Sequence, residues 1–165
     1  MPSPTRERIV AAAIAVGVFA CDRVSKAVVE DRVGAYDTIP AIPGLLNIVR
    51  SQNAGVAFGI FNETTSHNRT LLLIAVSLIA VAILAAMLWR IDRQDRLTAT
   101  GLALVFGGAL GNVFDRVRQG TVTDFLDLYF GTYHWYIFNL ADTAICIGAG
   151  LMMLSIWRTR KETEN

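Results

Sequence analysis

The feature that most constrains this chain is the stretch of residues 71–89, which holds nineteen residues and not one charge. A helix of that length can cross the hydrocarbon core of a bilayer, which is roughly 30 Å thick. Residues 97–114 and 139–157 form two more apolar runs, the last with one acid near its start. Charged residues make up only 18% of the chain, whereas a soluble domain carries about 25%. The sequence therefore predicts an integral membrane protein.

The first apolar run, residues 9–21, is shorter and is followed at once by charges. A secretory signal peptide would have a similar run, with Arg6 and Arg8 as its basic start. No small-x-small cleavage site follows, however, and the helical pattern continues, so we expect a span over residues 9–29. The expected fold class is an all-α membrane protein with four transmembrane helices and a small extracytoplasmic β-element, forming a single domain over residues 1–165.

Basic residues indicate the orientation of the four expected spans. They gather in the N-terminal tail, in the short loop 90–96 and in the C-terminal tail from Arg158 onward. Cytoplasmic segments carry an excess of lysine and arginine, so both termini are expected on the cytoplasmic side. The two remaining connections, 30–70 and 117–138, then lie outside.

The outer segment 36–62 is expected to form the β-element. Two short strands, Leu46–Ser51 and Val56–Phe61, are predicted around a turn at residues 53–55. The second outer segment is rich in aromatic residues over 129–138, which suit the membrane–water interface. We expect it to lie against the β-element.

Several function classes are disfavoured by composition. The net charge of +1 gives no polybasic patch, so nucleic acid is not an expected partner. The chain has two cysteines, Cys21 and Cys146, both inside apolar runs, and two histidines, His67 and His134. This excludes a disulfide scaffold and argues against a metal site built on several such residues. We expect no metal and no cofactor.

Two acids are candidates for catalysis. Asp124 follows the third expected span, and Asp142 lies about one turn into the fourth. The topology places both near the outer face, where two carboxylates in a poorly hydrated cleft would share a proton. The ionised member can take a proton from water while the protonated member polarises a peptide carbonyl. Such a pair can hydrolyse a peptide bond.

Structural roles for these acids remain open from spacing alone. Asp142 would also serve as a helix cap or dipole partner. Asp124 would also be a solvated loop residue, as we expect Asp127 to be. Asp22 and Lys26, at an i,i+4 spacing, suit an ion pair; that pairing argues against a Ser25–Lys26 catalytic dyad.

A non-enzymatic four-helix protein, such as a transporter subunit, is the competing class. Its acids would line an ion path, with polar residues through the middle of several spans; here the polar residues gather at one end. The Gly-x-Gly-Asp string typical of presenilin-like aspartyl proteases does not occur. Gly107 and Gly111 form a GxxxG pattern that favours close helix packing.

Five motifs, in order and between the expected spans, carry a resemblance over nearly the whole chain. They are Asp22 to Lys26 (DRVSK), Asn53 to Phe58 (NAGVAF), Gly107 to Arg116 (GGALGNVFDR), Val122 to Phe125 (VTDF) and Phe138 to Asp142 (FNLAD). In these motifs the chain resembles the lipoprotein signal peptidase, or signal peptidase II, family. Ala54 stands where many relatives carry Thr, a departure that touches no proposed catalytic atom.

The resemblance implies an aspartyl endopeptidase of the bacterial inner membrane with Asp124 and Asp142 as its catalytic pair. The family removes the signal peptide of diacylglyceryl-modified prolipoproteins, cutting just before the lipidated cysteine, and is inhibited by globomycin, a cyclic peptide that mimics the substrate. The expected partners are thus prolipoproteins, membrane lipid and globomycin-type inhibitors, with the enzyme a monomer. Asp22 and Lys26 are expected to be structural, and the expected substrate-binding residues are Asn53, Gly55, Gly108, Asn112, Arg116 and Asn139.

Overall fold

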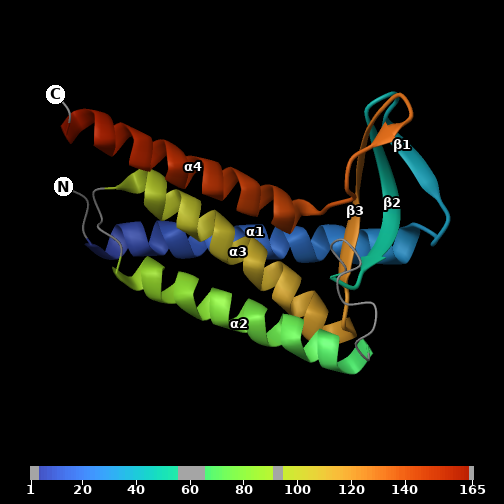
Figure 1. The fold of residues 1–165 in the computed structure, drawn as a ribbon, viewed down its shortest axis with the longest axis horizontal. Coiled ribbons are helices and arrows are strands. Elements are labelled where there is room, and N and C mark those ends of the chain that lie inside the picture. Colours follow the sequence, from blue (N-terminus) through green and yellow to red (C-terminus); the bar gives the residue numbers. More distant parts are fainter. Residues whose placement is uncertain (1–3, 56–65, 91–94, 164–165) are drawn as a thin grey trace.

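Four long helices run from the end that holds both termini toward a small sheet at the other end (Figure 1). The structure is a computed structural model, and it describes residues 4–55, 66–90 and 95–163. In chain order its elements are α1 (Pro4–Arg32), β1 (Thr38–Ile42), β2 (Leu46–Asn53), α2 (Ser66–Arg90), α3 (Arg96–Gln119), β3 (Val122–Phe130), β4 (Tyr133–His134) and α4 (Leu140–Thr163).

The sheet is antiparallel, with strand order β1-β2-β3-β4. Strand β2 confirms the strand predicted at Leu46–Ser51, whereas the one predicted at Val56–Phe61 lies outside the described residues. The segment expected to lie against this sheet instead contributes β3, which pairs directly with β2 and sets Ser51 opposite Asp124. Strand β3 can begin so soon after α3 because Gly120 ends that helix at φ 78°, a conformation that glycine adopts without strain.

Among the residues that the structure describes, three helices are long and apolar enough to cross a membrane: Thr70–Arg90 in α2, Arg96–Gln119 in α3 and Leu140–Lys161 in α4. They agree with three of the four predicted spans. The fourth, α1, is as long as these helices, but Asp22, Arg23 and Lys26 interrupt its apolar run.

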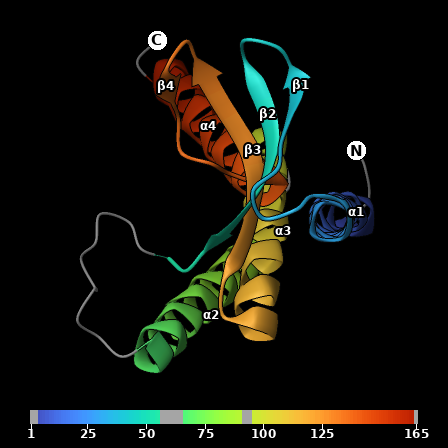
Figure 2. The same cartoon turned by 90° about the vertical axis from the view of Figure 1, so that its right-hand side faces the viewer.

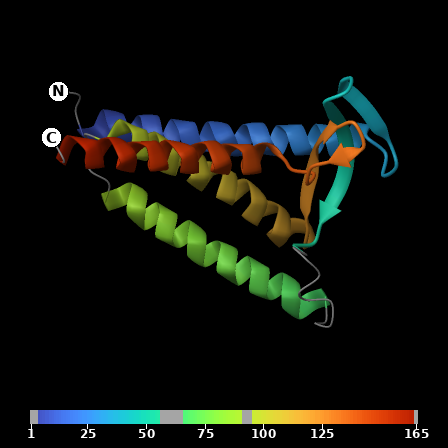
Figure 3. The ribbon, with the colours of Figure 1, turned by 45° about the horizontal axis from the view of Figure 1, so that its top comes forward.

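Helix α3 packs against both α1 and α4, and Figure 3 shows the three helices together; glycines lie at these contacts. A Cβ added to Gly107 would lie 2.6 Å from the backbone oxygen of Ala15 in α1. Gly101 in α3 and Gly148 in α4 face one another in the same way, each against the other's backbone oxygen. Small residues at such crossings let helix backbones pack tightly within a bilayer, so the GxxxG pattern serves packing here.

A buried cluster of charges holds α1 against α3 and α4. The Lys26 Nζ atom lies 2.8 Å from Asp22 Oδ2 and 2.9 Å from Asp115 Oδ2, and all three side chains are fully buried. Arg23 also pairs with Asp115. The other oxygen of Asp22, Oδ1, accepts a hydrogen bond from the Ala141 N–H at the start of α4. The ion pair expected from the i,i+4 spacing is therefore present, and it is part of a balanced set of two acids and two bases.

Replacing Lys26 by methionine tests this cluster. The variant leaves Asp22 and Asp115 buried with less positive charge, and breaking a buried pair in this way costs about 3–5 kcal/mol. We expect a clearly lower thermal unfolding midpoint in detergent. Arg32→Gln, at an exposed position in the last turn of the same helix, is the control, and equal midpoints for the two variants would contradict the cluster's role.

Candidate active site

Asp124 lies in β3 with its side chain turned into the protein, and the residue is only 2% exposed. Its two carboxylate oxygens accept hydrogen bonds from side-chain amides on different elements. Asn53 Nδ2, at the end of β2, donates to Oδ2 at 3.0 Å, and Asn139 Nδ2 donates to Oδ1 at 2.6 Å. The alternative that Asp124 is a solvated loop residue is therefore wrong.

Asp142 lies in the first turn of α4 and forms a reciprocal cap with Asn139. The Asn139 N–H donates to Asp142 Oδ2 at 3.3 Å, and the Asp142 N–H donates to Asn139 Oδ1 at 3.0 Å. This is the geometry of a capping box, which satisfies two free N–H groups at a helix start. The capping role anticipated for Asp142 is thus present. The cap uses Oδ2 of Asp142, and its other oxygen, Oδ1, accepts a hydrogen bond from Asn112 Nδ2 at 2.8 Å.

Asn139 brings the two acids together. It is fully buried, and its side chain caps Asp142 through Oδ1 while donating through Nδ2 to Asp124. Asn112, also buried, lies beside it: its Oδ1 accepts bonds from Asn139 Nδ2 at 3.3 Å and from Lys26 Nζ at 3.1 Å. The two carboxylates are thus held by one shared set of amides from α3 and the start of α4.

Burial and charge make Asp124 an unusual acid. Removal from water, together with the nearby charge of Asp142, raises its pKa to about 6, although hydrogen bonds from Asn53 and Asn139 oppose the rise. A carboxyl group with this pKa keeps its proton at pH values at which an ordinary aspartate has already lost its own. Two carboxyl groups that influence one another in this way can hold a single proton between them.

The other predicted binding residues differ in their surroundings. Arg116 is half-buried and its Nη1 atom lies 3.5 Å from the backbone oxygen of Asn112, a weak contact that leaves most of its donors for other partners. Asn53 Oδ1 accepts the N–H of Gly55 at 2.8 Å, with Gly55 at φ 77°, so a tight turn aims the Asn53 amide at Asp124.

Gly108 is the predicted binding residue that the structure separates from the others. A Cβ at this position would lie 2.5 Å from the Ala141 backbone oxygen, so α4 fills the space beside Gly108. Gly111 faces Asp22 in the same manner. Both glycines serve helix packing, and we do not include them in the proposed site.

Asp127 was expected to be solvated, and that expectation is wrong. The residue is 5% exposed and accepts bonds from Asn47 Nδ2 at 3.0 Å and from His134 Nδ1 at 2.8 Å. Burial alone would raise the pKa of Asp127, but these hydrogen bonds and the nearby histidine lower it below its ordinary value. Asp127 therefore joins β2, β3 and β4 and is no solvated control for the pair.

Sequence reasoning gave no role to Asp115, Arg23 or Thr123. The first two complete the buried charge cluster, and Thr123 is a fully buried residue whose hydroxyl donates to Glu30 at 2.7 Å. For Asp115, the sequence did offer a signal that the residue has a structural role, because a charge stands there between apolar turns of a helix. Their partners lie about ninety residues away, however, and no spacing rule could identify them.

The chain is similar to known proteins over most of its length. The sequence profile of a family described as "Signal peptidase (SPase) II" matches residues 14–158. A lipoprotein signal peptidase of Solibacter usitatus (strain Ellin6076) is 49% identical over 92% of this chain and 93% of its own. One from Geobacter sulfurreducens is 38% identical over 90% and 92%. A solved bacterial membrane enzyme is similar in structure, with a TM-score of 0.81 and 29% identity, covering 93% of this chain and 90% of its own.

The coupling of the two acids predicts the direction of a pKa change. In Asp142→Asn, the negative charge that helps to raise the pKa of Asp124 is gone. The Asp124 pKa should fall below about 6 yet stay above the ordinary aspartate value of 3.8, because burial remains the larger cause. Carboxyl carbon NMR of selectively labelled enzyme in micelles measures it. An unchanged pKa would mean that the two acids do not interact.

Proposed function

The chain belongs to the signal peptidase II family, proteases that remove signal peptides from prolipoproteins, and on this premise we propose that Asp124 and Asp142 are its catalytic pair. Asn139 is the observation that carries the proposal. One buried amide group caps Asp142 and donates to Asp124, so the same side chain contacts both carboxyl groups and holds them in one site.

The proposed reaction needs only these acids and a water molecule. Both oxygens of Asp142 already accept N–H bonds, and we assign Asp142 as the base that takes a proton from the water. Asp124, with its raised pKa, donates a proton to the oxygen of the scissile carbonyl as water attacks the carbon. Substrate that displaces water would raise the Asp124 pKa further, because burial disfavours the charged form. As the C–N bond of the tetrahedral intermediate breaks, the protonated Asp142 supplies a proton to the departing amine, and the ionised Asp124 takes a proton back from a hydroxyl group of the intermediate.

We propose that all four helices span the bilayer, with both termini cytoplasmic and residues 1–165 forming one peptidase domain. The charges that interrupt the apolar run of α1 are compatible with a span, because Asp22 and Lys26 are fully buried and paired within the bundle. Charged groups at membrane depth are tolerated when they face the protein interior in pairs. Asp124 in β3 and Asp142 at the start of α4 would then lie near the outer face of the bacterial inner membrane; Figure 2 shows these two elements meeting at the sheet end of the molecule.

The proposed substrate is a prolipoprotein whose cysteine carries diacylglyceryl, cut just before that cysteine. An apolar signal helix and two acyl chains would bring this substrate through lipid to a site at the outer interface. Asn53 and Arg116 have polar groups at the level of the pair, and we propose that they hold the extended backbone. Unmet backbone groups cost several kcal/mol in such surroundings.

We further propose that one copy of the chain is sufficient and that globomycin-type peptides bind in the same place. Every donor to Asp124 and Asp142 named above comes from this chain. A peptide that copies the substrate backbone would use the same contacts from Asn53 and Arg116.

The catalytic assignment is tested by Asp124→Asn and Asp142→Asn. Each replacement keeps the shape of the side chain but cannot carry the proton, so cleavage of a lipid-modified prolipoprotein should fall by about 10²–10⁴-fold. Both variants should remain folded, which their thermal unfolding in detergent checks.

Asp31→Asn is the matched control, because Asp31 is an exposed acid at the end of α1. Its cleavage rate should equal that of the wild type. Rates near wild type in either Asp124→Asn or Asp142→Asn, measured on purified enzyme, would remove that residue from the mechanism.

Substrate contacts are tested by globomycin binding to Asn53→Ala and Arg116→Ala. Hydrogen bonds involving charged groups contribute about 1.5 kcal/mol or more, so loss of one from Arg116 should weaken binding at least about tenfold. Asn53→Ala should also raise the pKa of Asp124, because the Asn53 hydrogen bond lowers it. Arg118→Ala, two residues along α3 and exposed, is the control; affinity unchanged in Arg116→Ala would assign Arg116 to anchoring alone.

A further inference from the structure

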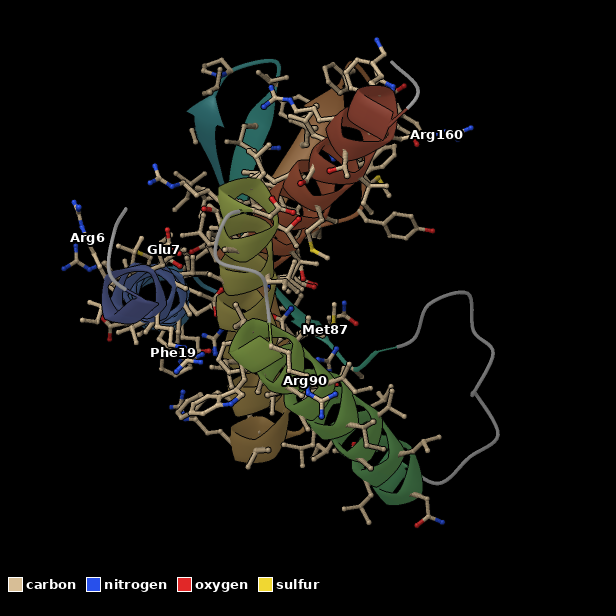
Figure 4. All side chains as sticks on the ribbon, turned by 90° about the vertical axis from the view of Figure 1, so that its left-hand side faces the viewer. Arg6, Glu7, Phe19, Met87, Arg90 and Arg160 are labelled. Carbon is tan, nitrogen blue, oxygen red and sulfur yellow. The ribbon has the colours of Figure 1, made fainter. Side chains whose placement is uncertain are left out.

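A cavity lies at the opposite end of the molecule from the proposed catalytic pair. It is a cavity of about 270 Å³ between the first turns of α1, the last turn of α2 and the first turn of α3. Figure 4 looks onto this end, where Arg6 and Glu7 on α1 and Arg90 on α2 are labelled. No part of the proposed reaction uses this cavity.

The cavity exists because two helices share a neighbour but do not pack on one another. Across the described residues, α1 and α2 each pack against α3, while their backbones stay apart. Figure 4 shows them on different sides of α3. Apolar side chains line the wedge from both sides, with Val10 and Ile14 on α1 and Leu88 on α2. In a bilayer, a gap of this kind would be filled by a lipid chain.

Cationic side chains surround the mouth of the wedge. Arg6, Arg8 and Arg96 all line the cavity, and Glu7 is the one acid among the described residues that line it. The Arg8 guanidinium lies 4.6 Å from the centre of the Trp89 ring, which joins α1 to α2. Glu7 and Arg96 are 3.9 Å apart, with the Arg96 side chain 77% exposed, so that pair is weak. Three arginines and one glutamate leave an excess of positive charge.

We propose that this wedge binds an anionic phospholipid, with the phosphate group at the arginines and an acyl chain along Val10, Ile14 and Leu88. Arginine recognises phosphate through several N–H donors in a fixed plane. Tryptophan at the end of an apolar helix lies at headgroup level. A free phosphate would use the arginines but not the apolar walls, and a zwitterionic lipid would use the walls but gain less from the excess charge. The site is independent of the catalytic assignment.

The test is native mass spectrometry of the full chain in detergent, with phosphatidylglycerol or phosphatidylethanolamine of identical acyl chains. Wild type should retain one phosphatidylglycerol in preference to phosphatidylethanolamine. Each arginine near an anionic headgroup strengthens the binding affinity roughly fivefold. The double variant Arg8→Gln/Arg96→Gln should therefore bind phosphatidylglycerol about 25-fold more weakly. Arg158→Gln, an exposed arginine of α4 at the same end of the molecule, should bind as wild type does.

Glu7→Gln gives a result of opposite sign and keeps the test valid if the double variant folds poorly. Removing the one acid should strengthen phosphatidylglycerol binding and leave phosphatidylethanolamine binding unchanged. Equal retention of the two lipids by wild type, or equal loss in Arg158→Gln, would overturn the proposal. Displacement of the lipid by inorganic phosphate at equal concentration would also overturn it, because the acyl chain would then contribute nothing.

Discussion

The position of the candidate site depends on the ammonium group of Lys26. This group has three N–H donors and no acceptor, and it is surrounded by Asp22, Asp115 and the side chain of Asn112. Asn112 must therefore turn its oxygen toward Lys26, which turns its NH₂ group toward Asp142. A charge buried between α1 and α3 thus sets the direction of a hydrogen bond to a proposed catalytic oxygen. Asp22 adds a second constraint, because it accepts the Ala141 N–H and fixes the start of α4.

Asn139 extends the same logic to the sheet. Its oxygen is committed to the Asp142 N–H, so its NH₂ group faces Asp124 in β3. Two asparagines, each with one direction available to it, thereby join a helix start and a strand into one site. Buried polar groups of this kind are stable only when each has a partner. The satisfied network therefore holds both carboxyl groups in place before any substrate arrives.

Patterns in the sequence predicted the structural features that depend only on residues close together in the chain. Uncharged runs predicted the apolar helices, and the i,i+4 spacing predicted the pair of Asp22 and Lys26. The motifs around Asp124 and Asp142 indicated a shared site. Spacing alone could not decide whether Asp142 is a helix cap or a catalytic acid, and the structure shows that it does form a capping box. Long-range packing was beyond such patterns: Asp127 is buried because Asn47 and His134 come to it from other strands. Gly108 was expected to bind substrate, but the close approach of α4 to α3 fills the space beside it.

The most direct test of the account is an experimental structure of the enzyme with a bound substrate-like peptide, at a resolution that shows ordered water. One water that bonds to both acids can bridge carboxylate oxygens no more than about 6 Å apart. If Asp124 and Asp142 act as a pair, their nearest oxygens lie within this distance, with the scissile carbonyl or its analogue beside them. A wider separation, or a side chain filling the space between the two acids, would contradict the claim that they act as a pair.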